Sequence, residues 1–107
     1  MRLLRTSTFN RDLKRLGATD EEARAIGMEI AANPEAGKVV KGLGGIRKLR
    51  FAYGGRGKRG GGRAIYFLMV AADTAVLLFA YGKNEREDLT PAQRKLALQL
   101  MKEIKDG

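Results

Sequence analysis

Two long apolar segments in the second half of the chain constrain the fold more than any other feature. Residues 63–70 and 74–81 are apolar on both faces, and the turn-like sequence Ala71-Ala72-Asp73 separates them. A connection this short joins antiparallel strands, because parallel strands need a long crossover. We therefore expect two central strands of a sheet that is covered, at least in part, on both sides.

The N-terminal third of the chain carries the signals of two helices. Thr8 can cap a brief helix over residues 9–16. Thr19, followed three residues later by Glu22, has the capping-box pattern of a second helix, which ends before Pro34. From Gly45 onwards the pattern instead has a period of two, which predicts a strand.

The C-terminal segment predicts a third helix. It begins at Thr90-Pro91, and its apolar stripe consists of Leu96, Leu100 and Ile104. Helices, then an antiparallel sheet, then a helix define the α+β class. We expect one domain over residues 1–107, with two N-terminal helices, an antiparallel sheet of three to four strands and a C-terminal helix; residues 3–6 are the short optional strand.

A long block of one-signed charge indicates the kind of partner. No acidic residue lies between Glu35 and Asp73, whereas nine lysines and arginines do. These nine equal the excess of the 21 basic over the 12 acidic residues in the whole chain. Solvated surfaces ordinarily mix both signs, so the block predicts a polyanionic partner, most commonly a phosphate backbone.

Missing residue types exclude several kinds of chemistry. The chain has no cysteine and no histidine. Zinc sites of the usual types are therefore excluded, and so is imidazole as a general acid or base. We expect no metal and no cofactor. No apolar run is long enough to span a bilayer, so we expect a cytoplasmic protein without a membrane partner.

The glycine-rich segment 54–62, GGRGKRGGG, is the first candidate for function. A nucleotide-binding P-loop needs a lysine followed by Ser or Thr and then a helix, but here Arg59 follows Lys58 and a strand follows the loop. The segment is then either a mobile basic hairpin tip that lies on a nucleic-acid backbone or a solvated loop. Basic residues in the flanking strands, such as Arg50 and Arg63, favour binding because paired strands place them on one surface.

The second candidate is Tyr81-Gly82-Lys83-Asn84-Glu85, at the end of the last apolar strand. Strand ends commonly hold functional residues, because the sheet fixes them while the loop leaves them accessible. Taken alone, Tyr81 is more simply a core or rim tyrosine, and Lys83 is ordinary surface charge.

Several short motifs occur together in a characteristic order. They are Asn33-Pro34, then GLGGIRKLR from Gly42, GKRGG from Gly57, Arg63-Ala64-Ile65-Tyr66, and YGKNEREDL from Tyr81. This ordered set resembles the HigB-type branch of the RelE/ParE toxin superfamily, the toxin halves of bacterial type II toxin–antitoxin pairs. The resemblance extends from about Asn33 through the last helix.

The resemblance implies a function and two partners. Toxins of the RelE and HigB type cut messenger RNA in the ribosomal A site, so it implies a ribosome-dependent endoribonuclease that acts on mRNA on the ribosome. It also implies a cognate antitoxin, which in HigB systems usually has a helix-turn-helix domain. The active residues of such toxins are mostly basic and aromatic, which suits a chain without histidine.

The resemblance also implies the candidate catalytic residues, which are Arg63, Lys58, Tyr81 and Lys83. It places Arg56 in the loop region that supplies basic residues to the site. With the other basic residues of this loop and of the strand before it, the candidate RNA-binding residues are Lys48, Arg50, Arg56 and Arg59. Two departures leave the general base open: Asn84 stands where some RelE proteins have arginine, and residues 82–107 contain no tyrosine.

These assignments fit cleavage by attack of a ribose 2′-hydroxyl on the scissile phosphate. The guanidinium of Arg63 can donate parallel hydrogen bonds to phosphate oxygens as their charge grows. Lys58 or Lys83 is expected in proton transfer, and Tyr81 in orienting the nucleotide or donating a proton. Two alternatives remain: a ParE-type poison of DNA gyrase, and a non-catalytic RNA- or ribosome-binding protein.

Overall fold

The two apolar segments form adjacent central strands of a sheet, as predicted. The computed structural model describes residues 1–86 and 88–107. Its central strands are β4 (Gly62–Met69) and β5 (Thr74–Gly82), which pair antiparallel. Asp73, with a φ of 48°, closes the predicted turn between them in the left-handed conformation that aspartate tolerates. Every residue of β5 is buried, which confirms that both of its faces are covered.

Three further strands complete the sheet, in the order β1-β5-β4-β3-β2. β3 (Arg47–Phe51) pairs antiparallel with β4, and β2 (Lys38–Val39) pairs antiparallel with the first two residues of β3. β1 (Arg2–Arg5) lies parallel to β5 at the other edge. The α+β class is thus confirmed, but the sheet has five strands rather than three to four, because the two-residue β2 is too short to show a period.

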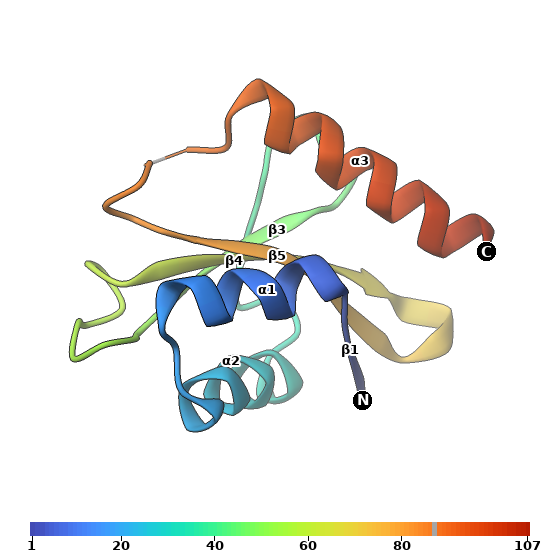
Figure 1. Cartoon of the computed structure of the whole chain (residues 1–107). Coiled ribbons are helices and arrows are strands. Elements are labelled where there is room, and N and C mark those ends of the chain that lie inside the picture. The colour runs from blue at the N-terminus through green and yellow to red at the C-terminus, as the bar shows by residue number, and fades with distance from the viewer. Residues whose placement is uncertain (87) are drawn as a thin grey trace.

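The helices cover both faces of the sheet (Figure 1). α1 (Ser7–Leu16) and α2 (Asp20–Ala32) lie on one side, and α3 (Pro91–Asp106) lies on the other. Two apolar clusters result, one between α1, α2 and the sheet and one beneath α3. No helix in the described part of the chain has the length and apolar character that a bilayer crossing requires.

The helix starts follow local sequence signals. Thr19 and Thr90 each accept a hydrogen bond from the third residue of their helix in a complete capping box, as predicted. The predicted cap of α1 was wrong by two residues. Thr6, rather than Thr8, is the N-cap, and its hydroxyl oxygen accepts a 3.0 Å hydrogen bond from the Phe9 N–H.

A buried tyrosine anchors the segment that leads from α2 to β2. The Tyr66 hydroxyl donates to the Pro34 carbonyl (2.7 Å) and accepts from the Gly37 N–H (3.0 Å). Burial raises the pKa of this phenol above its ordinary value. The contact therefore fixes the backbone just before Lys38.

Tyr66→Phe is expected to lower the free energy of unfolding by about 1–3 kcal/mol, because two backbone groups at this site lose their partner. Urea denaturation measures this change. An unchanged denaturation midpoint would show that water replaces the hydroxyl without loss.

Candidate nucleic-acid interface

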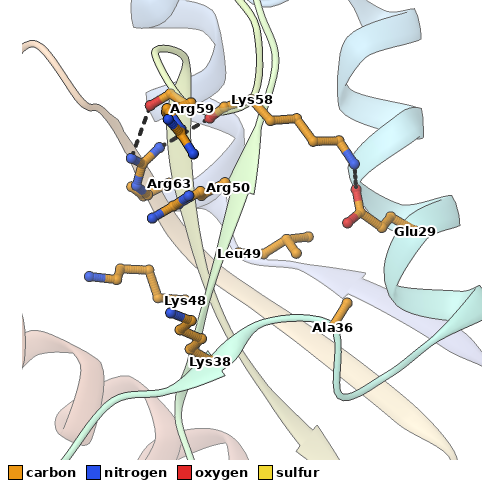
Figure 2. Close-up of a pocket in the computed structure, with 9 residues that line it drawn as sticks. All are labelled: Glu29, Ala36, Lys38, Lys48, Leu49, Arg50, Lys58, Arg59 and Arg63. Carbon is orange, nitrogen blue, oxygen red and sulfur yellow. Dashed lines mark hydrogen bonds and ion pairs between the residues drawn. The ribbon is translucent and has the colours of Figure 1, made fainter.

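Six cationic residues line one hollow beside β3. The hollow has a volume of about 580 Å³, and we call it the basic hollow (Figure 2). Its lining residues are Lys38 from β2, Lys48, Leu49 and Arg50 from β3, Lys58 and Arg59 from the glycine-rich loop, Arg63 from β4, Glu29 from α2, and Ala36. Among the residues that the structure describes, Glu29 is the one carboxylate in this lining.

Strand register explains why part of this charge lies on one surface. Arg50 is directly opposite Arg63 in the β3–β4 pair, and Lys38 is directly opposite Lys48 in the β2–β3 pair. Directly opposed residues of antiparallel strands place their side chains on the same face. Ile65 and Phe67 follow Arg63 on the same face of β4 and belong to the cluster beneath α3. The basic face is therefore the face of the sheet that α3 covers.

Arg63 lies at the base of the glycine-rich loop and is 4% exposed. Its Nη1 donates to the carbonyl oxygens of Gly62 (2.9 Å) and Lys58 (3.3 Å), and its Nη2 donates to that of Arg59 (3.2 Å). Side chain and loop therefore hold each other in place. The sequence did not reveal this second, loop-organising role of Arg63.

Lys58 belongs to the same loop, and its side chain extends to α2. Its Nζ is 2.9 Å from Oε1 of Glu29 in α2. Figure 2 shows the Lys58 side chain reaching across to α2, whereas Arg50 and Arg63 point to the other side of the hollow. The structure thus brings Lys58 into the basic hollow but keeps its ammonium group away from the two arginines.

Tyr81 and Lys83 do not line the basic hollow in the described part of the chain. Tyr81 is opposite Arg63 in the β4–β5 register, but it is fully buried in the cluster beneath α3. The Arg86 guanidinium lies 5.5 Å from the centre of its ring. Lys83 is half-buried, and its backbone N–H donates to the Gly61 carbonyl (2.9 Å), which ties the end of β5 to the loop.

Arg56 also lies apart from the other predicted RNA-binding residues. Its Nη1 donates to the Tyr53 hydroxyl (2.7 Å), and it lines a separate hollow of about 340 Å³ with Arg15 and Glu85. Glu85 forms an ion pair with Arg15 and accepts from the Gly82 N–H. Burial opposes ionisation of Glu85, but these contacts outweigh it and lower the pKa of its carboxyl group.

The structure adds one cation that sequence reasoning did not assign to the site. Lys38 belongs to the acid-free block of sequence, but only its pairing with Lys48 places it in the basic hollow. In the described residues, no group of three or more Asp, Glu, His or Cys side chains is placed to hold a metal ion.

Comparison with known proteins identifies the family. The family described as "RelE toxin of RelE / RelB toxin-antitoxin system" matches residues 1–106. The chain belongs to the RelE toxin family. Membership of this family implies a cognate antitoxin.

Solved structures of RelE toxins have the same fold. A mutant of the E. coli toxin RelE in the free state aligns with a TM-score of 0.58 and 13% identity, covering 92% of this chain and 95% of that chain. The toxin–antitoxin complex RelBE2 from Mycobacterium tuberculosis aligns with a TM-score of 0.50 and 23% identity, covering 81% and 92%. At these identities the likeness supports the RelE-like fold.

Proposed function

We propose that this RelE-family toxin is a ribosome-dependent endoribonuclease that cleaves mRNA in the A site. The observation that supports this most is the set of six cationic residues that line one hollow, with Arg50 and Arg63 directly opposite each other on neighbouring strands. Such a site suits a phosphate backbone and supplies fixed donors for a phosphoryl centre. We further propose that the toxin belongs to the HigB-type branch, acts in the cytoplasm and is neutralised by a helix-turn-helix antitoxin of the HigA type.

The proposed reaction is metal-independent attack of a ribose 2′-hydroxyl on the adjacent phosphate. The bond from phosphorus to the 5′-oxygen breaks as the new bond to the 2′-oxygen forms, which leaves a 2′,3′-cyclic phosphate and a 5′-hydroxyl. Arg63 and Arg50 stabilise the charge on the non-bridging oxygens. Of the two candidates for proton transfer, Lys58 lines the same hollow, whereas Lys83 is not among its described lining residues.

Free toxin is expected to be a poor nuclease. The basic hollow is open, and the Lys58 ammonium group is turned towards α2. For cleavage, the Lys58 ammonium group must move towards the scissile phosphate, and water must be excluded from the hollow. Binding of the message and the ribosome would bring about both changes.

Messenger mapping after induction tests the proposed reaction. Primer extension on cellular messages should reveal cuts in phase with codons, and these should disappear when translation initiation is blocked. DNA breaks without phased cuts would instead indicate a ParE-type gyrase poison. Binding without cuts or growth arrest would indicate a non-catalytic RNA-binding protein.

RNA binding should depend steeply on salt. If about five of the cations each neutralise one phosphate, log Kd should change with log salt concentration with a slope of about 3–4, from roughly 0.7 per contact for single strands. Fluorescence anisotropy with a short labelled RNA measures this slope. Lys48→Ala should reduce it by about 0.7, whereas Lys102→Ala, on the exposed side of α3, should leave it unchanged.

A further inference from the structure

Glu29 is the one carboxylate among the described residues that line the basic hollow, and Asp88 pairs with Lys48 from outside this lining (Nζ–Oδ1 3.3 Å). Glu29 lies on α2, and its Oε1 is 2.9 Å from the Lys58 Nζ. Glu29 comes from α2 and Lys58 from the glycine-rich loop, and their contact lies on the side of the hollow away from Arg50 and Arg63 (Figure 2). The pair therefore joins α2 to the glycine-rich loop.

The loop is held in two different ways. Its backbone is bound by the Arg63 guanidinium through the carbonyl groups of Lys58, Arg59 and Gly62. The Lys58 side chain, in contrast, is held only through its ammonium group at Glu29 in the contacts that the described residues show. The ammonium group can therefore change partner while the loop backbone stays in place.

Exposure makes such an exchange of partners easy. The side chains of Lys58 and Glu29 are 61% and 33% exposed. Ion pairs between exposed groups are weak because water and salt compete with them. A phosphate group bound by other cations of the hollow can compete with Glu29 for the Lys58 ammonium group.

We propose that Glu29 is a positioning residue that holds Lys58 against α2 until a phosphate backbone displaces it. This inference depends on the proposed function, since it concerns the same RNA-binding hollow. The Glu29 carboxylate and an RNA phosphate then compete for the same Lys58 ammonium group. This competition weakens the binding of weak or misplaced RNA ligands to the free toxin.

A double-mutant cycle tests the proposal with the full-length toxin and a short fluorescein-labelled single-stranded RNA. Glu29→Gln should tighten binding about two- to fivefold at low salt, the size expected when an exposed ion pair no longer competes. In a Lys58→Ala background the same substitution should have no further effect. Glu103→Gln, an equal change of charge at the far end of α3, should leave the affinity unchanged. A gain of affinity cannot arise from damage to the fold, so it separates the proposed role from a merely structural one.

Two results would overturn the proposal. The first is that Glu29→Gln binds RNA no more tightly than the wild type. The second is that the substitution tightens binding equally with and without the Lys58 side chain, which would show that the carboxylate acts only as a general repulsive charge. If the wild type binds RNA and Glu29→Gln changes nothing, this inference fails while the proposed function stands. If the wild type binds no RNA at low salt, both fail.

Discussion

Arg63→Ala is expected to reduce ribosome-dependent mRNA cleavage by about a hundred- to a thousandfold. Loss of one preorganised donor to a transition-state oxyanion typically has an effect of this size, about 2.7–4 kcal/mol. Single-turnover cleavage of a message on programmed ribosomes measures the rate, and growth arrest at matched protein levels gives the cellular result. Full toxicity of the variant would show that Arg63 has no part in the reaction.

The three carbonyl contacts of Arg63 require a control for loop structure, since the alanine variant loses them as well. Arg94→Ala is a matched variant, because Arg94 also donates to a backbone carbonyl, that of Lys41 (2.8 Å), but lies on α3 away from the basic hollow. It should keep wild-type activity. Arg63→Lys retains the charge without the planar fork, so it should bind RNA nearly normally and still cleave slowly.

Gly61→Ala is expected to reduce cleavage by about a hundredfold, because it displaces the loop that carries Lys58 and Arg59. A Cβ atom at Gly61 would lie 2.2 Å from the Phe51 carbonyl oxygen and 2.9 Å from that of Gly57. Both obstacles are backbone atoms, so relief requires the loop to move. Displacements of about 1 Å in a catalytic constellation can cost on the order of a hundredfold in rate.

The neighbouring glycine provides the control for this experiment. A Cβ atom at Gly60 would have no other atom within 4 Å, so Gly60→Ala should retain activity. Cleavage assays and thermal denaturation of both variants give the comparison. Equal activity of the two would show that the position of the loop does not matter, and equal loss would show that any loss of loop freedom is harmful.

Features of the fold that depend on neighbouring residues were predictable from the sequence. The capping boxes at Thr19 and Thr90 use groups three residues apart, and the apolar pattern of β4 and β5 is continuous along the chain. β2 was not predicted because a strand of two residues is too short to show an alternating apolar pattern, and only its pairing with β3 defines it.

The candidate site was predictable in composition but less so in geometry. All six lysines and arginines that line the basic hollow, Lys48, Arg50 and Arg63 among them, come from the acid-free block. The direction of the Lys58 side chain depends on Glu29, which is 29 residues away and outside that block. The burial of Tyr81 depends on α3, which packs over it from the C-terminal end of the chain. Such long-range contacts leave no local signal.

The parallel pairing of β1 with β5 has a consequence for synthesis of the toxin. Arg2–Arg5 leaves the ribosome well before its partner, Thr74–Leu77, is made. The nascent chain therefore cannot close this edge of its sheet until Leu77 has emerged. Pairing between segments so distant in sequence is entropically costly and slow, so β1 waits unpaired long after it has been synthesised.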